Sequence, residues 1–295
     1  MLSLAMNFYS ASLKYEGMVM TIKPLNLDNF IDTEKPITEI SSKKIIAAGV
    51  KSKLIDIINL MLSKKLRKIP IIDESGNLKG IISSIDLLDL FGGGEKHEIF
   101  RKNRESMKTK VENFMTKHVK TIHQRTDIRR SLEIFKTERS GLYPVVDSKK
   151  VVSVVSEWDF VKLINTAVGV KVYDVMVERP FFVRKGHNIY DVAKMMCRGG
   201  SRRLPVVEDN ILIGMVTPTD ILMHLHKNST YKSLFLEKTR VESIMRKEII
   251  TIDPESDIFL AANMMKNMHV GGIPVLDDEE IIGIITERDI VDAFA

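Results

Sequence analysis

Four short boxes, each a Ser or Thr followed three residues later by an Asp, recur along the chain with residue types suited to one kind of chemistry. A carboxylate can accept a hydrogen bond from each hydroxyl of a vicinal diol at the same time. Charge-assisted bonds of this kind contribute about 1.5–3 kcal/mol each. Each box therefore predicts a site for a ribose. The boxes are Ser83…Asp86, Ser156…Asp159, Thr217…Asp220 and Thr286…Asp289.

The same four boxes have a purely structural interpretation. A Ser or Thr followed three residues later by an acid, just before an apolar helix, is close to a capping box that satisfies the first backbone amides of the helix. One Asp can cap a helix and bind a ligand together, so both interpretations stay open. The residues around each box have to distinguish them.

The residues just before four prolines alternate between basic and small types. Arg67-Lys68 and Arg202-Arg203 precede the first and third proline, whereas Gly141-Leu142 and Gly271-Gly272 precede the second and fourth. Glycines let the backbone approach a flat base, and a guanidinium fork suits phosphate oxygens. We expect a base over the second glycine pair and phosphates near Arg203 and Arg288. In the alternative interpretation, Arg202 and Arg203 are solvated charges on a strand edge.

These motifs belong to an internal repeat. The prolines Pro70, Pro144, Pro205 and Pro274 each lie in a short apolar strand, and 16, 15, 15 and 15 residues separate them from the Asp of the following box. Counting back 29 residues from the last three prolines gives Met115, Met176 and Met245. The first repeat has Ser41 at the methionine position, and the second has Ser153 where the others have Gly80, Gly214 and Gly283.

Within one repeat the apolar period changes from strand to helix and back. In the fourth copy, residues 249–252 and 281–285 predict strands, and a 3.6-residue period over 258–268 predicts a helix. One unit of about 55 residues is thus β-α-β-β-α, and it has to pair with another to bury its sheet. The predicted helix is apolar at Ile258, Ala261, Ala262, Met265 and Met268.

These features resemble the CBS (cystathionine β-synthase) domain family, with Gly283-Ile-Ile-Thr286-Glu-Arg288-Asp289 as the most typical copy. The resemblance implies an α/β (α+β) fold in which four CBS repeats pair, first with second and third with fourth, into two pseudo-two-fold Bateman modules. Four copies without another domain are similar in layout to the gamma subunit of AMP-activated protein kinase. We divide the chain into an N-terminal extension 1–35, repeats 36–92, 111–168, 172–227 and 241–295, and a linker 93–110.

The resemblance also implies ligands that contain adenosine, bound in clefts between paired repeats. We expect AMP, with ADP or ATP as further candidates. The most typical copies give the set Thr251, Gly272, Ile273, Pro274, Thr286, Arg288, Asp289, Arg202, Arg203, Thr217 and Asp220. The first module departs more from the pattern and gives Lys68, Ser83, Asp86, Thr121, Ser156 and Asp159.

The chain length and the motifs limit the classes of function that we expect. The repeats use nearly the whole chain of 295 residues, and we find no nucleophile–base pair, phosphate loop or metal-spaced His cluster. We therefore expect a non-enzymatic regulator without a catalytic cofactor or metal, which senses a nucleotide and acts on an unidentified protein. Alternatives are a sensor of S-adenosylmethionine or NAD, a nucleic-acid-binding protein using basic residues 95–110, and a scaffold with inactive sites.

The remaining features concern the environment of the chain. The net charge is 44 − 39 = +5, which suits an anionic ligand. A single cysteine, Cys197, indicates a reducing compartment. No apolar run reaches 18 residues, and the first Lys is residue 14, so we expect a cytoplasmic protein without a membrane span, either as one closed chain or as a homodimer.

Overall fold

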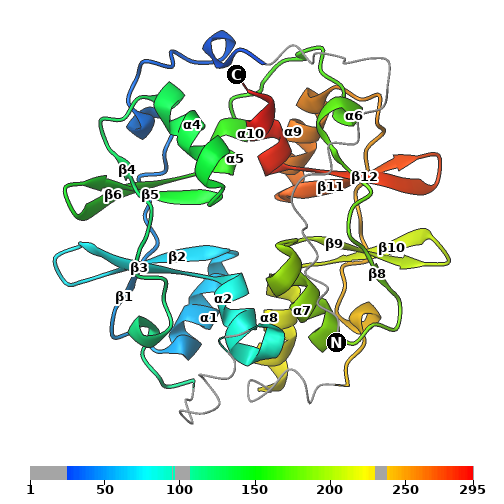
Figure 1. Cartoon of the computed structure of the whole chain (residues 1–295), viewed down its shortest axis with the longest axis horizontal. Helices are drawn as coiled ribbons and strands as arrows, with labels where there is room; N and C mark the ends of the chain where they lie inside the picture. The colour runs from blue at the N-terminus through cyan, green and yellow to red at the C-terminus, as the bar shows by residue number, and fades with distance from the viewer. Residues whose placement is uncertain (1–24, 95, 97–106, 230–237, 295) are drawn as a thin grey trace, which may run out of the picture.

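The computed structural model describes residues 25–94, 96, 107–229 and 238–294. Four repeats occupy the four quadrants of the view in Figure 1, with the first and second on one side and the third and fourth on the other. The hairpins point outward and the helices of the two sides meet in the middle. This confirms the mixed α/β class and the four paired repeats.

The two repeats of the first module each carry a three-stranded sheet. Repeat 1 contains β1 (Ala48–Gly49), α1 (Leu54–Lys64), β2 (Lys68–Ile72), β3 (Leu78–Ser83), α2 (Ser84–Leu88) and a π-turn at Asp89–Gly93. Repeat 2 contains β4 (Ile122–His123), α4 (Ile128–Glu138), β5 (Leu142–Asp147), β6 (Lys150–Ser156) and α5 (Glu157–Val161).

The strands of the second module join in one six-stranded sheet. Repeat 3 contains α6 (Val172–Val175), β7 (Val177–Glu178), β8 (Val183–Arg184), α7 (Ile189–Gly199), β9 (Leu204–Glu208), β10 (Ile211–Val216) and α8 (Pro218–Asn228). Repeat 4 contains α9 (Ile258–Met268), β11 (Gly272–Asp277), β12 (Glu280–Thr286) and α10 (Glu287–Ala293). Single 3-10 turns at Leu27–Asn29, Ile37–Glu39, Val111–Asn113 and Val241–Ser243 complete the short elements.

The helix predicted over 258–268 is α9, and four of its five predicted apolar positions are buried. The fifth, Met268, is 56% exposed because it lies in the last turn beside the left-handed cap at His269. The strand predicted over 249–252 is shorter than expected, since only Ile252 forms a bridge, to Val275.

A methionine-on-glycine contact pairs the repeats within each module. A Cβ built on Gly80 would lie 2.5 Å from Sδ of Met115, and one on Gly214 would lie 2.3 Å from Sδ of Met245. Gly283 faces Met176 in the same way, at 2.3 Å. Only glycine leaves room for the methionine of the facing repeat. In the fourth such position, Ser41 and Ser153 replace both partners and share a hydrogen bond of 2.7 Å in the interior.

Two hydrophobic cores join the modules. One core combines buried side chains of repeats 1 and 3, where α2 packs against α8, and the other combines repeats 2 and 4, where α5 packs against α10. The two modules therefore close on each other within a single chain (Figure 1).

Strand register brings the residues before each proline next to a box. In β2 and β3, Lys68 pairs with Ser83, and in β11 and β12, Gly272 pairs with Thr286. Leu142 pairs with Ser156 in the second repeat. Each of these three hairpins thus places one member of the alternating pairs beside a Ser or Thr at the start of a helix.

Candidate functional site

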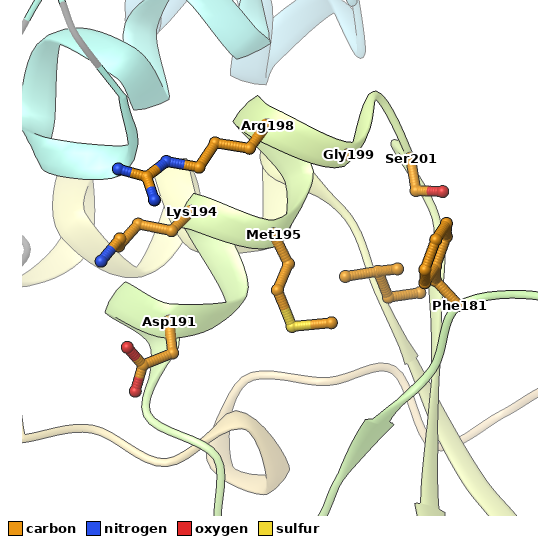
Figure 2. Close-up of a pocket in the computed structure, with 8 residues that line it drawn as sticks. Phe181, Asp191, Lys194, Met195, Arg198, Gly199 and Ser201 are labelled. Atoms are coloured by element: carbon orange, nitrogen blue, oxygen red, sulfur yellow. The ribbon is translucent and has the colours of Figure 1, made fainter. Parts of the chain in front are cut away.

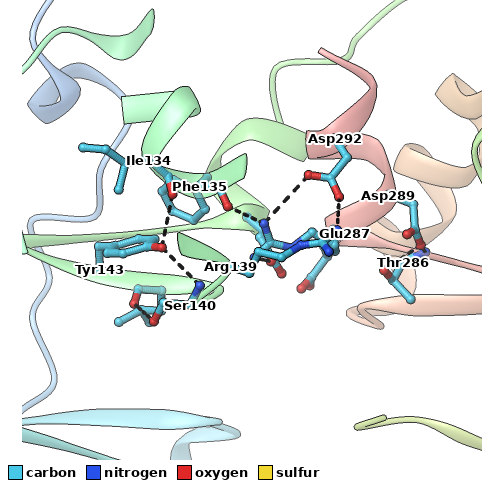
Figure 3. Close-up of polar contacts among 12 residues, drawn as sticks. Ile134, Phe135, Arg139, Ser140, Tyr143, Thr286, Glu287, Asp289 and Asp292 are labelled. Atoms are coloured by element: carbon cyan, nitrogen blue, oxygen red, sulfur yellow. Dashed lines mark hydrogen bonds and ion pairs between the residues drawn. The ribbon is translucent and has the colours of Figure 1, made fainter. Parts of the chain in front are cut away.

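All four boxes cap helices. Thr286 donates to Oδ2 of Asp289 from its backbone N–H and from its hydroxyl, both at 2.7 Å, and its hydroxyl accepts from the Asp289 amide (Figure 3). The other three boxes have the same reciprocal arrangement at the starts of α2, α5 and α8. The structural interpretation of the boxes is therefore correct, and it uses only one oxygen of each carboxylate.

The second carboxylate oxygen distinguishes the boxes. Lys96 lies 2.6 Å from Oδ1 of Asp86, Lys162 lies 2.7 Å from Oδ1 of Asp159, and Arg246 donates to Oδ1 of Asp220 at 3.0 Å. Among the described residues, no group donates to Oδ1 of Asp289. Burial raises the pKa of Asp289 from 3.8 to about 6, against the lowering effect of its bonds to Thr286. One box of four has a carboxylate oxygen ready for a ligand.

Arg203 lies across the start of β11. A Cβ built on Gly271 would lie 2.0 Å from Nη2 of Arg203, and one on Gly272 would lie 2.8 Å from its Cδ. The guanidinium thus fills the place where we expected a base, and its head is 3.7 Å from Glu287. Burial, followed by repulsion from Arg67, lowers the pKa of Arg203 to about 10. The strand-edge interpretation does not hold for this side chain, which is only 16% exposed.

Arg288 points away from the box that contains it. Its Nη2 lies 2.5 Å from Oε1 of Glu157 in the second repeat, and its Nη1 donates to the backbone oxygen of Phe135 at 2.5 Å. Both charged heads are largely buried, at 17% and 13% exposure. Arg288 therefore links the two modules in this structure, rather than facing Thr286 and Asp289 as we expected.

A cavity of about 280 Å³, the central cavity, lies where the four repeats meet. Gly141 stands on its wall beside the guanidinium of Arg202, whose Nη1 would be 3.6 Å from a Cβ there. The single tryptophan, Trp158, also faces it. Each repeat contributes to the lining: Lys65, Leu66, Arg67 and Lys68 from the first, Gly141, Leu142, Ser156, Glu157 and Trp158 from the second, Arg202 from the third, and His269, Val270 and Glu287 from the fourth.

Positive charge exceeds negative charge around this centre. Glu287 is 5% exposed and binds the Arg67 guanidinium through two hydrogen bonds of 3.1 and 2.7 Å. Burial, followed by the neighbouring Arg202, lowers the pKa of Lys68 to about 8. Burial raises the pKa of Glu157. Glu157 and Glu287 thus lie among the cations Arg67, Lys68, Arg202, Arg203 and Arg288, with Lys65 also in the cavity lining and Asp86 as a further carboxylate near Lys68 and Arg202.

A second cavity of about 380 Å³, the α7 cavity, is mostly apolar (Figure 2). Met195 and Phe181 point toward each other across it, and Leu204 also lines it. Phe181 follows β7, which pairs with β12 of repeat 4, and Leu204 directly follows Arg203. All the residues that line this cavity belong to repeat 3. Its remaining wall is formed by Asp191, Lys194, Arg198, Gly199 and Ser201.

The other expected residues are near these features without lining a cavity. Ile273 and Pro274 are buried in β11, so only their backbone can face a ligand. Thr121 and Thr251 are exposed, each just before a residue that pairs with a proline-containing strand. Thr217 and Ser83 serve as helix caps whose Asp partners are ion-paired.

Our sequence analysis did not include Glu157, Glu287 or Phe181 among the site residues. A signal for the glutamates was present, because each follows the Ser or Thr of an even-numbered box, where the odd repeats have Ser84 and Pro218. Phe181 has no comparable signal in the repeat pattern. Met195 packs against the core of repeats 1 and 3 and also lines the α7 cavity.

The remaining findings concern the residues that the structure describes. No helix there is long and apolar enough to cross a membrane. No group of three or more His, Cys, Asp or Glu in the same part of the chain could hold a metal ion. Burial raises the pKa of Cys197 to about 12. Most of the basic segment 95–110 lies outside the described residues.

The fold, the repeated boxes and the central cavity define a protein built of paired regulatory repeats. The model of the CBS domain matches residues 37–93, 111–166, 172–227 and 241–295, and the chain belongs to this family. It is 30% identical over 270 residues to protein MJ1225 of Methanocaldococcus jannaschii, covering 86% of this chain and 96% of that protein. The crystal structure of MJ1225, described as a proposed archaeal homolog of g-AMPK, matches with a TM-score of 0.82, at 28% identity, over 88% of this chain and 100% of that one.

Two further relatives are similar to this chain over different lengths. A 33.4 kDa protein of the ribosomal RNA operon of Thermofilum pendens is 29% identical over 81% of this chain and 84% of its own length. The homoserine O-acetyltransferase of Methanococcoides burtonii is 34% identical over 43% of this chain, but the match covers 24% of the enzyme. The likeness to that enzyme is thus confined to a small part of it.

Proposed function

We propose that this chain is a regulatory sensor that binds an adenine nucleotide, AMP or a more highly phosphorylated form, in its second module. The observation that carries the proposal is the Asp289 carboxylate, which is partly buried and has one oxygen without a donor among the described residues. A ribose diol would supply the missing hydrogen bonds. The three corresponding carboxylates already have basic partners.

Other parts of the second module suit the rest of a nucleotide. The α7 cavity offers an apolar slot beside Phe181 and Met195 for the base. Arg203 directly precedes Leu204 of this cavity and covers Gly272, which pairs with Thr286 of the box. Its guanidinium would meet the phosphates.

The charge balance favours phosphates over a cationic ligand. S-adenosylmethionine carries a positive sulfonium, and cations already outnumber carboxylates at the centre. NAD carries phosphates and remains the other ligand that these contacts would accept. Isothermal titration with AMP, ATP, NAD and S-adenosylmethionine at fixed salt would rank them, and tighter binding of S-adenosylmethionine than of AMP would overturn the role of Arg203.

Regulation would pass through Glu287. This carboxylate lies 3.7 Å from Arg203 of its own module and forms two hydrogen bonds with Arg67 of the other. A phosphate that draws Arg203 away would change the partners of Glu287 and so the contact between modules. The ligand can shift the equilibrium between the two arrangements only to the extent that it binds one of them more tightly than the other. A protein that reads this arrangement would be the regulated partner.

A further inference from the structure

The residue that follows each methionine of the methionine-on-glycine contacts lies at a fixed place beside a box of the facing repeat. Arg246 and Met215 exchange two backbone hydrogen bonds, of 2.8 and 3.0 Å, and Val177 pairs with Ile284 in the same register. The strand partner always lies five residues before the Asp of its box. The four pairs are Ser42 with Val154, Thr116 with Ile81, Val177 with Ile284 and Arg246 with Met215.

In the second module, the side chain at this place differs between the two boxes. Arg246 donates from Nε to Oδ1 of Asp220 at 3.0 Å. Val177 holds the same register beside the box of Asp289, and a valine side chain has no hydrogen-bond donor. Within the part of the chain that the structure describes, Oδ1 of Asp289 receives no hydrogen bond. The facing repeat thus occupies one carboxylate and leaves the other free.

The first module occupies its carboxylates in another way. Lysines that follow each box along the chain reach the second oxygen: Lys96 lies 2.6 Å from Oδ1 of Asp86, and Lys162 lies 2.7 Å from Oδ1 of Asp159. The comparison is therefore restricted to the second module, where two boxes share one backbone register and differ in the residue beside them.

We propose that Arg246 is a built-in competitor for a ribose at Asp220, and that Val177 is the residue that leaves Asp289 free for a nucleotide. Asp220 uses Oδ2 for Thr217 and Oδ1 for Arg246, so a diol has to displace the guanidinium. The Arg246 side chain is 56% exposed, so it can leave Asp220 without opening the core. This inference rests on the proposed function, because it assigns one nucleotide to the second module and names the residues that set this number.

The test exchanges the two residue types and counts AMP by calorimetry, with the full chain at fixed ionic strength. Arg246→Val should add a second bound AMP, at Asp220. Val177→Arg should weaken binding at Asp289 about tenfold or more, because a charge-assisted hydrogen bond then has to break before the diol can bind. Both effects are opposite to those of charge alone, since an added cation attracts an anionic nucleotide and a lost cation does not.

Matched controls keep the charge change and move it away from the boxes. Lys247→Val removes the neighbouring exposed cation and should leave one bound AMP. Ile211→Arg adds a cation at a 55% exposed position that pairs with Glu280, and it should not weaken binding. Val177→Gln supplies a donor without a charge and tests the same contact if Val177→Arg fails to fold. Val177→Thr introduces the residue type of Thr116 and should keep the affinity.

The outcomes separate this inference from the nucleotide site itself. Unchanged affinity in folded Val177→Arg, or a single bound AMP in Arg246→Val, would overturn the inference and leave the site at Asp289 standing. Asp220→Asn added to Arg246→Val should remove the second AMP, and its retention would also overturn the inference. If the natural protein binds no AMP but Arg246→Val binds one, the site at Asp289 is refuted and the role of Arg246 is supported. If neither protein binds AMP, both proposals fail.

Discussion

Replacing Asp289 with Asn should make the folded protein more stable while removing its ligand. Burial raises the pKa of Asp289 to about 6 from 3.8, so the ionised carboxylate is disfavoured in the folded state. A difference of 2.2 pKa units corresponds to about 3 kcal/mol at pH 7. The Asn oxygen can still accept from Thr286, and a weaker cap costs about 1 kcal/mol. The free energy of unfolding should therefore rise by about 2 kcal/mol.

The pH dependence of this gain has a definite sign. Because the pKa of Asp289 is higher in the folded protein, the cost of its charge is present in full above pH 6 and is absent below about pH 4. The advantage of Asp289→Asn over the natural protein should shrink as the pH falls through this window. Urea unfolding at pH 7.5, 6 and 4.5 measures it.

Asp220→Asn is the matched control. Asp220 occupies the same box position, but its second oxygen accepts from Arg246 at 3.0 Å. Losing a partly exposed ion pair and part of a cap should lower the free energy of unfolding by about 1–2 kcal/mol. If both variants lose stability equally, Asp289 has partners that satisfy it, and the argument for a ligand at this carboxylate fails.

The same pair of variants should differ in binding. Two hydroxyl contacts to a charged acceptor, at about 1.5–3 kcal/mol each, predict a loss of AMP affinity of about a hundredfold or more in Asp289→Asn. Asp220→Asn should change it little. Calorimetric titration of both variants gives the comparison, and retained affinity in Asp289→Asn would place the ribose elsewhere.

Three further outcomes are expected. Phe181→Ala should leave the stability within about 0.5 kcal/mol, because the side chain is 64% exposed, yet weaken AMP binding, with Phe182→Ala outside the cavity lining as the control for calorimetry. Glu287→Gln should lower the free energy of unfolding by about 3 kcal/mol in urea, because it leaves buried Arg203 and half-buried Arg67 without their carboxylate. Gly214→Ala should cost about 1–3 kcal/mol by overpacking, since the new Cβ would meet Met245, and adding Met245→Ala should recover part of it if the contact is the cause.

The sequence predicted the fold well because its strongest signals are local and repeated. The spacing from Pro274 to Asp289 includes one hairpin, and its register pairs Gly272 with Thr286. The two exceptions to the repeat, Ser41 and Ser153, were visible separately in the sequence, and the structure shows that they compensate each other. This pairing cannot be predicted from a single sequence, because the spacing does not indicate which of the unusual residues contact each other.

The site was less predictable because its contacts cross between repeats. The sequence identified Arg203 and the glycines before Pro274, and these residues do meet. It placed Arg288 near its own box, but a side chain at a helix start can turn either way, and Glu157 of another repeat decides the direction. The outer partners of Asp86 and Asp220, Lys96 and Arg246, lie 10 and 26 residues farther along the chain, beyond any local pattern.

The alternating pairs differ between the modules at two positions. Gly271 and Gly272 have no side chains, and Arg203 lies over the start of β11. In the first module Leu142 stands where Gly272 stands, and Lys68 stands where Arg203 stands. The Lys68 amine donates to Ser140, and Lys68 and Leu142 both line the central cavity. The same repeat unit thus places an arginine over the strand in one module and a lysine beside the central cavity in the other.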